Sequence, residues 1–383
     1  MNKLTTSTIS RFTVLDSFRG IFALCVVVFH THYFNSITET SFFRGSDSFV
    51  DFFFVLSGFV ITHSYAYKKD ISFKKFTVSR FFRLFPLHIA TLIFYILLEI
   101  CKLVAYRYGI AFNKPPFSAE NDPSQIIPNL LLLQSWTTYT NALSFNYPAW
   151  SISIEFYIYL IFFITLLVKG LYRNILWFFI ASIATLLFSN SYLTTADILS
   201  ITVLRGLSGF FAGALTYLLY KNTHNIIKLG NIGSSLFEIS LVISILFVIS
   251  SNFDSKGIVL LFLFSASIFI FAFEKGLLSS LFSKQLFNGI GKLSYSIYMT
   301  HAPILFMILS LYMILEKFLK TKSMILMIKG LRFVDFGSIF LNNLGVLITV
   351  ITVLLVSNIT YKYIEIPGQR FGKKFIKKYI THE

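Results

Sequence analysis

Apolar segments of about twenty residues recur along almost the entire chain, and they restrict the fold more than any other feature. Crossing the hydrocarbon core of a bilayer as an α-helix takes about 20 predominantly apolar residues. Short polar loops separate segments of this kind throughout the sequence. We predict ten of them, at residues 14–34, 48–65, 84–105, 148–168, 172–188, 199–220, 232–251, 258–273, 294–315 and 340–361. The expected fold class is therefore an all-α, polytopic membrane protein.

The composition agrees with a membrane environment. Hydrophobic residues make up 55% of the chain and charged residues only 13%, whereas soluble domains average about 25% charged residues. No long polar block interrupts the 383 residues, so we expect one membrane domain over 1–383 without an appended soluble extracytoplasmic domain. The net charge of +16 lies largely in loops and the tail. There it sets topology and meets anionic lipid, so nucleic acid is not an expected partner.

Basic residues concentrate in two regions that the positive-inside rule assigns to the cytoplasm. Six lysines and arginines lie within residues 68–83 and six more within residues 362–378. With ten spans, both termini are then cytoplasmic. Residues 316–337 disagree, because they should lie outside and yet carry five lysines and arginines. We therefore leave open a half-span or an eleventh crossing near residues 324–328.

Ionisable residues inside the predicted spans are the first candidates for chemistry, because charge at membrane depth is costly and usually functional. Arg19 and His30 are eleven residues apart, so they share one helix face about 16 Å apart along the axis. His30 and Glu155 both fall near the outer boundary, and we expect them to share a site. A carboxylate beside an imidazole orients the ring and supports it as a general base.

Arg80 and Arg83 lie one helical turn apart at the expected cytoplasmic mouth of the third span. This spacing suits a two-arginine clamp for phosphate. A phosphate site near one membrane face and a base near the other favour a phosphorylated donor whose arm reaches into the domain.

Structural roles compete with these interpretations. A histidine in a span can serve a helix–helix hydrogen bond, and an arginine pair can anchor topology. Arg205 could neutralise Glu155 as a purely structural partner, and Ser57-Gly58 most simply permits close helix packing. The loop over 106–147 has room for a re-entrant or interfacial piece at residues 126–136, and we expect this loop to face the acceptor.

The order of motifs along the whole chain resembles the membrane-bound acyltransferase family 3. These motifs are L-D-S-F-R-G-(x)9-H (15–30), D-F-F-F-V-L-S-G-F (51–59), R-F-F-R-L-F-P (80–86), W-S-I-S-I-E-F-Y (150–157), L-S-Y-S-I-Y-M-T-H-A-P (293–303) and Y-I-E-I-P (363–367). The resemblance implies a domain of ten or eleven helices that transfers acyl groups, commonly acetyl from acetyl-CoA, to hydroxyls of surface polysaccharides.

The resemblance also implies roles for individual residues. His30 matches the essential histidine, Arg19 the arginine eleven residues earlier, and Glu155 the glutamate of the S-x-E motif. The coenzyme A phosphates would dock at Arg80 and Arg83. Further candidates are His301, Asp16 and Ser153.

No metal is implied as a cofactor. The expected acceptor is a saccharide or lipid-linked glycan, such as an O-antigen of lipopolysaccharide, a capsule or an exopolysaccharide unit. The expected location is a bacterial inner membrane. His30 would either deprotonate the acceptor hydroxyl or become transiently acylated, and the sequence leaves both routes open.

Two other functions remain open at this point. One is an acyltransferase with another acyl donor or a non-sugar acceptor. The glycerolipid-type H-x-x-x-x-D signature is absent, since Asn35 follows His30 and Lys68 follows His63 at that spacing. The other is a multi-pass transporter, which should carry internal repeats or broken spans in matching halves. We find no such repeat.

Overall fold

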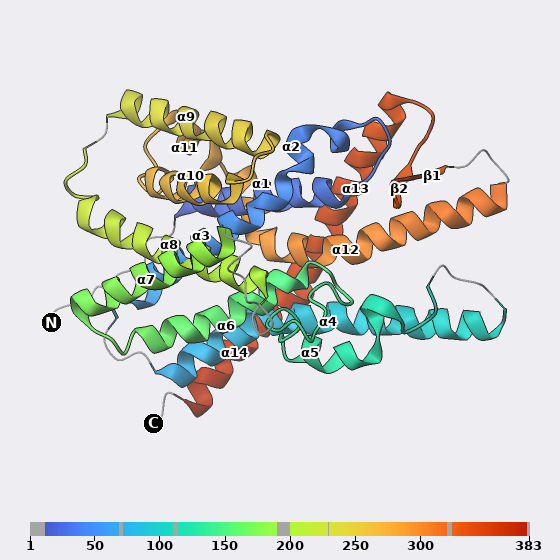
Figure 1. The fold of residues 1–383 in the computed structure, drawn as a ribbon, viewed down its shortest axis with the longest axis horizontal. Coiled ribbons are helices and arrows are strands. Elements are labelled where there is room, and N and C mark those ends of the chain that lie inside the picture. The colour runs from blue at the N-terminus through green and yellow to red at the C-terminus, as the bar shows by residue number, and fades with distance from the viewer. Residues whose placement is uncertain are drawn as a thin grey trace.

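The structure is a computed structural model that describes residues 12–68, 72–109, 114–189, 200–228, 230–319 and 324–380. Long helices account for most of the described part (Figure 1). They are α1 (Thr13–His30), α3 (Phe49–Tyr65), α4 (Phe73–Arg107), α6 (Ala149–Thr165), α7 (Gly170–Ser189), α8 (Ile201–Thr223), α9 (Asn231–Ser250), α10 (Lys256–Phe271), α12 (Gln285–Leu319) and α13 (Ile339–Thr360). The shorter helices are α2 (Ser41–Arg44), α5 (Ile126–Leu130), α11 (Leu277–Phe282) and α14 (Ile366–Tyr379).

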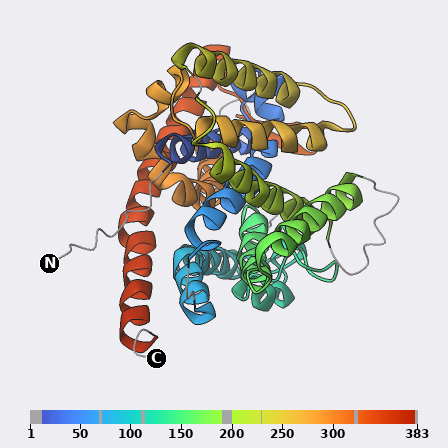
Figure 2. The ribbon, with the colours of Figure 1, turned by 90° about the vertical axis from the view of Figure 1, so that its left-hand side faces the viewer.

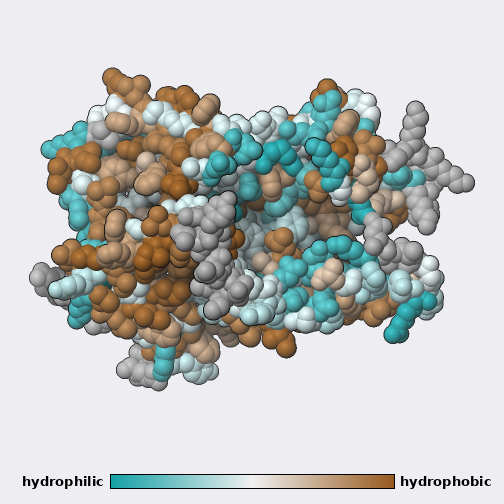
Figure 3. All heavy atoms as spheres, in the orientation of Figure 1, coloured by the Kyte–Doolittle hydropathy of each residue, from teal (hydrophilic) through white to brown (hydrophobic). Residues whose placement is uncertain are grey.

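These helices confirm an all-α, polytopic membrane protein. Eight helical segments of the described chain are long and apolar enough to cross a bilayer, and α6 and α10 are shorter apolar helices at two further predicted positions. Large apolar side chains remain exposed along them, among them Phe247 on α9 and Phe262 on α10. Figure 3 shows apolar side chains over much of the face on which α7, α9 and α10 lie. A surface of this kind suits contact with lipid tails.

The basic regions gather at one end of the bundle. Residues 72–83 at the start of α4 and the basic helix α14 lie side by side at the left of Figure 1, and Figure 2 shows α14 running along the outside of the molecule. The Phe82 and Phe371 rings lie 5.3 Å apart at this contact. By the positive-inside rule this end faces the cytoplasm.

Two helices begin earlier than the predicted spans. The helix α4 begins at Phe73, eleven residues before the predicted start at residue 84, and α12 begins at Gln285 instead of residue 294. The hydropathy pattern missed the first turns of α4, because four charged residues lower the local hydropathy without interrupting the helix. They are Lys74, Lys75, Arg80 and Arg83.

The half-span or eleventh crossing that the sequence leaves open near residues 324–328 is not present in the described residues there. The strands β1 (Ile325–Ile328) and β2 (Leu331–Val334) pair antiparallel with each other. Lys329 and Gly330 connect them with φ values of 49° and 80°, the conformation of a tight hairpin turn. Strands of four residues are far shorter than the roughly 9–11 residues that cross a bilayer. Residues 320–323, with two of the basic residues, lie outside the described part.

The same hairpin explains why the first span ends early. The helix α1 stops at His30, and the chain beyond it pairs with β2. The Phe34 amide donates to the Val334 carbonyl at 2.9 Å, and the Val334 amide donates to the His32 carbonyl at 2.9 Å. These bonds take residues 32–34 out of the helix that hydropathy alone predicts.

The outer loop returns into the bundle around the short helix α5, as its length suggested. The His88 ring Nε2 lies 2.7 Å from the Asn129 carbonyl, and the Tyr157 hydroxyl donates to the Leu131 carbonyl at 2.9 Å. Tyr157 lies eight residues into α6, about 12 Å from its outer end. The loop therefore descends below the outer ends of α4 and α6.

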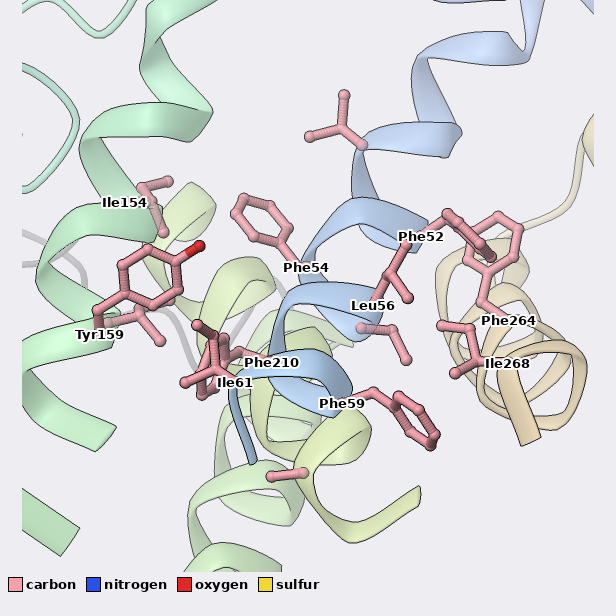
Figure 4. Packing of buried hydrophobic residues seen from close by; sticks show 14 of the residues in the cluster. Phe52, Phe54, Leu56, Phe59, Ile61, Ile154, Tyr159, Phe210, Phe264 and Ile268 are labelled. Atoms are coloured by element: carbon pink, nitrogen blue, oxygen red, sulfur yellow. The ribbon is translucent and has the colours of Figure 1, made fainter. Parts of the chain in front are cut away.

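Glycines allow α3 and α8 to approach closely. Ideal Cβ atoms at Gly58 and Gly213 would each lie 1.8 Å from a backbone oxygen of the facing helix. This confirms that Ser57-Gly58 sits at a close helix contact. Beside it, Phe52, Leu56 and Phe59 of α3 pack toward α10 (Figure 4), so α3 is the central helix of the core.

We predict that Gly213→Ala lowers the stability of the protein, because the added methyl would overlap the Val55 carbonyl. Overpacking of this kind costs about 1–3 kcal/mol. The matched control is Gly233→Ala in α9, where a Cβ meets nothing within 4 Å. Thermal unfolding of the purified variants in detergent measures the difference. Equal unfolding temperatures for the two variants would contradict the close α3–α8 contact.

Candidate active site

A cavity of about 500 Å³ runs through the bundle along α3. It opens at the cytoplasmic end beside Lys68, and its lining follows α3 from Tyr65 to Val50, a path of about 22 Å at 1.5 Å per residue. The helices α1, α4, α6 and α12 supply the other walls. Such a shape accepts a long, narrow ligand end-on from the cytoplasm.

Five of the eight predicted site residues line this cavity. They are Asp16, Arg19, Arg80, Arg83 and Glu155. With Lys68 at the opening, four cationic side chains face two carboxylates, so the lining carries a positive balance. A positive cleft with low-dielectric walls concentrates anionic ligands.

The two arginines of R-F-F-R occupy different environments and do not form a symmetric clamp. The Arg80 guanidinium lies over the rings of Tyr65 and Tyr159, at 5.6 and 5.8 Å, and donates to the Tyr65 hydroxyl at 3.3 Å. Its Nε is buried and has no hydrogen-bond partner among the described residues. A buried polar nitrogen without a partner is uncommon in folded proteins.

Arg83 lies deeper than the sequence suggested. It is ten residues into α4, about 15 Å from the start of the helix, and interacts electrostatically with Glu365 and Glu155. Arg80, seven residues into α4, lies about 10 Å from that start, so both arginines lie further inside the domain than the predicted span at residues 84–105 implied. The difference follows from the early start of α4, which places the motif inside the domain.

Glu155 does not pair with His30. It accepts hydrogen bonds from the Ser57 hydroxyl at 2.7 Å and from the Tyr159 hydroxyl. Among the described residues, no hydrogen bond or ion pair joins Glu155 to His30. Arg205 does not neutralise Glu155 either, because its Nε and second amino nitrogen bind both oxygens of Asp51, at 2.5 and 3.0 Å. The rotation of α6 about its axis directs Glu155 toward α3 and the arginines.

His30 instead contacts His301, beyond the end of the cavity that lies away from the cytoplasm. The two imidazole rings are stacked with centroids 5.3 Å apart, and the Tyr147 ring lies 4.7 Å from His30 and 6.0 Å from His301. Tyr298 lines the cavity and has its ring centroid 5.8 Å from that of His301. Tyr298 thus connects the cavity to the histidine pair.

His301 is fully buried and positioned by its own helix. Its Nδ1 lies 3.3 Å from the Ile297 carbonyl, and its Nε2 has no hydrogen-bond partner among the described residues. A carbonyl can only accept, so Nδ1 carries the hydrogen and Nε2 keeps its lone pair. The site therefore contains a buried imidazole whose acceptor nitrogen, Nε2, accepts no hydrogen bond from the described residues.

Arg44 of α2 holds the end of α1 that carries His30. It donates to the Val28 and Thr31 carbonyls at 3.2 and 3.0 Å, and another of its amino groups lies 3.0 Å from the His32 Nδ1. Burial, with the nearby Arg44 charge as a second cause, lowers the pKa of His32 to about 4. His32 is therefore neutral at physiological pH and accepts a hydrogen bond from Arg44.

The remaining two predicted residues differ in their roles. The Asp16 Oδ1 lies 3.7 Å from a terminal nitrogen of Arg19 within the cavity. Ser153 does not line the cavity, because its hydroxyl donates to the Leu132 carbonyl at 2.6 Å and is fully buried. Its position points to a structural role in holding the re-entrant loop.

Sequence reasoning did not select Glu365, Tyr147 or Tyr298. Glu365 is 3% exposed and accepts hydrogen bonds from the Ser296 hydroxyl at 2.8 Å and from Gln369 at 3.1 Å. It ends the π-helical turn Tyr361–Glu365, a distortion that is frequent at functional sites. Glu365 and Tyr298 lie within the motifs at 363–367 and 293–303, which were their sequence signal, whereas Tyr147 lies outside every motif.

Comparison with known proteins adds three findings. The family model described as "Acyltransferase domain" matches residues 12–362. "Acyltransferase MdmB" of Streptomyces mycarofaciens is 36% identical over 114 residues, which cover 30% of this chain and 26% of that protein. "Protein 2 in picA locus" of Rhizobium radiobacter is 33% identical over 154 residues, which cover 38% of this chain and 77% of that protein. No solved structure matches the chain.

Proposed function

The chain belongs to the acyltransferase family whose model spans residues 12–362, and from this premise we propose that it moves an acetyl group from acetyl-CoA to a hydroxyl of a cell-surface saccharide. The acyltransferase class and the multi-pass membrane fold follow from the family match and the helices. The donor and acceptor are our proposal. One observation carries it: a positively lined cavity leads from the cytoplasmic end to Tyr298, which contacts His301 of the stacked histidine pair.

The cavity fits a donor of this shape and charge. Coenzyme A carries several negative phosphate charges on one end and a thin arm on the other, and acetyl-CoA supplies the acetyl group as a thioester. Arg80 and Arg83 would hold phosphate groups, since guanidinium groups bind phosphate through several parallel N–H donors. Arg80 has a buried Nε without a partner in the described chain, which supports this assignment.

His30 and His301 would handle the proton of the acceptor hydroxyl. Two protonated imidazoles in ring contact repel each other, so at least one stays neutral and can accept a proton. His30 then acts either as the general base toward the hydroxyl or as a transiently acylated nucleophile. Glu155, which lies with the arginines, would set the charge of the donor site instead of supporting His30.

The acceptor would approach from the outer end, where Tyr147 and the loop over residues 114–148 meet His30. A saccharide unit or lipid-linked glycan at the membrane surface presents hydroxyls to this position. Both relatives come from bacteria, and a bacterial inner membrane would place the donor side in the cytoplasm and the acceptor side outside.

The test is the O-acetyl content of surface polysaccharide, measured by NMR in host cells. The strains carry the intact gene, a deletion, or the His30→Ala variant at matched protein levels. We expect acetyl signals to disappear in the deletion and in the variant. Unchanged acetylation in the deletion would overturn the acetyl-to-saccharide proposal and point to another donor or acceptor.

A further inference from the structure

Three cations surround two tyrosines at the cytoplasmic mouth of the cavity. The Lys68 ammonium lies 5.3 Å from the centroid of the Tyr65 ring. The Arg173 guanidinium and the Lys221 ammonium lie 5.1 and 3.0 Å from the centroid of the Tyr67 ring. The first turn of α7 and the last turn of α8 bring Arg173 and Lys221 to Tyr67, and Tyr65 and Lys68 lie beside Tyr67 in the turn that ends α3. We refer to them as the mouth cluster.

No carboxylate balances the mouth cluster within the part of the chain that the structure describes. Three other cations in that part have acidic partners, in the pairs Arg205–Asp51, Lys102–Glu99 and Lys114–Glu120. The Nε of Arg173 is buried and lacks a hydrogen-bond partner in the described residues. Like charges that lie close together repel, and a bound anion would relieve that repulsion.

The mouth cluster meets the donor cavity at two of its residues, whereas Tyr67, Arg173 and Lys221 lie outside the lining. Lys68 and Tyr65 line the cavity, and the Tyr65 hydroxyl accepts a hydrogen bond from Arg80 at 3.3 Å. A ligand with phosphate at Arg80 would therefore place whatever lies on the far side of that phosphate against Tyr65 and Lys68, from which Tyr67 is one or two residues away in the chain.

We propose that the mouth cluster binds the 3′-phosphorylated adenosine end of coenzyme A. This assignment rests on the proposed function and extends it, because it separates two phosphate sites. The diphosphate lies deeper, at Arg80, and the 3′-phosphate lies at Lys68, Lys221 and Arg173. The tyrosine rings offer apolar faces on which an adenine base stacks, as bases do on aromatic side chains.

Arg173 also stabilises the local structure, so the test variants leave it unchanged. It donates to the Ala66 carbonyl at the end of α3 at 2.9 Å, and its guanidinium lies 4.9 Å from the centroid of the Trp177 ring. Lys68 and Lys221 are exposed and make no such backbone contact. The double variant Lys68→Gln/Lys221→Gln therefore tests ligand binding with the least effect on folding, and the single Lys221→Gln variant provides a second, milder change.

The experiment compares coenzyme A with dephospho-coenzyme A, which lacks only the 3′-phosphate. Calorimetric titration of the purified full chain in detergent gives both Kd values. Because a charge-assisted contact with phosphate is strong, we expect wild type to bind coenzyme A about tenfold more tightly than dephospho-coenzyme A. The double variant should lose this preference, and its affinity for dephospho-coenzyme A should fall much less than its affinity for coenzyme A, because Lys68 also lines the cavity. Lys284→Gln, which removes an exposed cation outside the cavity lining, should keep it.

Three results separate the two proposals. Equal affinities of wild type for the two compounds overturn the mouth cluster as a 3′-phosphate site while leaving coenzyme A as the donor. If the correctly folded double variant keeps the full preference for coenzyme A over dephospho-coenzyme A, the mouth cluster is likewise overturned as a 3′-phosphate site. Absence of binding of either compound to wild type overturns the donor assignment itself, and the mouth-cluster assignment with it.

Discussion

Substituting His30 by asparagine lowers the rate of acyl transfer by about 10³-fold or more, the upper part of the range for loss of a general base. Asparagine keeps a planar polar side chain but cannot accept a proton or form an acyl intermediate. Its effect on folding is small, because the described contacts of His30 are ring contacts with Phe29, Tyr147 and His301. Initial rates with labelled acetyl-CoA, together with the unfolding temperature, measure both quantities.

Two companion variants make the result specific. His301→Asn should also lower the rate strongly, because it removes the second imidazole of the stacked pair. His224→Asn is the matched control, since His224 is exposed at the end of α8 and its ring contacts only Lys221 and Tyr220 among the described residues. Near wild-type transfer by His30→Asn would contradict the assignment of His30 to catalysis.

The same variants separate the two chemical routes. Wild type incubated with labelled acetyl-CoA and no acceptor retains label on the protein only if His30 becomes acylated. Loss of that label in His30→Asn would identify the covalent route. A wild type that transfers normally but never retains label would use His30 as a base alone.

Hydropathy predicted the helices well because the bilayer imposes a simple requirement. Each span must bury its backbone polar groups in a helix and present apolar side chains to lipid. The bounds of α7, α8 and α13 fall within a few residues of the prediction. The failures lie where charged side chains lower the hydropathy of a helix, as at the start of α4, or where strand pairing competes with the helix, as at residues 32–34.

The sequence predicted which residues belong to the site better than it predicted which of them contact each other. The sequence singled out His30, Glu155 and the arginines, and five of the eight selected residues line one cavity. It could not predict that Glu155 bonds to Ser57 and His30 stacks on His301. Partners across helices depend on how each helix is rotated about its axis, and side-chain packing over many positions sets that rotation.

Substitution of Arg83 should mainly lower the stability of the protein, whereas substitution of Arg80 should mainly weaken donor binding, although both residues belong to one motif. Arg83→Met removes the cation that acts on both Glu155 and Glu365 inside the bundle. Removing one partner from a fully buried set of opposite charges costs about 3–5 kcal/mol, because the remaining charges are left uncompensated; Arg83 and Glu155 are half-buried in the cavity wall, so the cost here should be smaller. We therefore expect Arg83→Met to unfold at a lower temperature in detergent than wild type.

Arg80→Met should unfold close to wild type, because Arg80 contacts tyrosine rings and hydroxyl groups and no carboxylate among the described residues. Its loss should instead raise KM for acetyl-CoA by about tenfold, the usual size of one lost charge-assisted contact. Unfolding temperatures and donor KM values for both variants test this difference. Equal increases in KM with equal stability would restore the symmetric phosphate clamp that the spacing of the two arginines suggests.

The double variant Arg83→Met/Glu365→Gln tests why Arg83 matters. If the loss of stability comes from an uncompensated Glu365, removing that charge as well should recover most of it, and the two substitutions will be strongly non-additive. Donor binding should not recover, because the cavity still lacks the Arg83 charge. Recovery of stability without recovery of turnover would therefore assign two separate tasks to Arg83: neutralising the carboxylates of the bundle, and binding the donor from the same position.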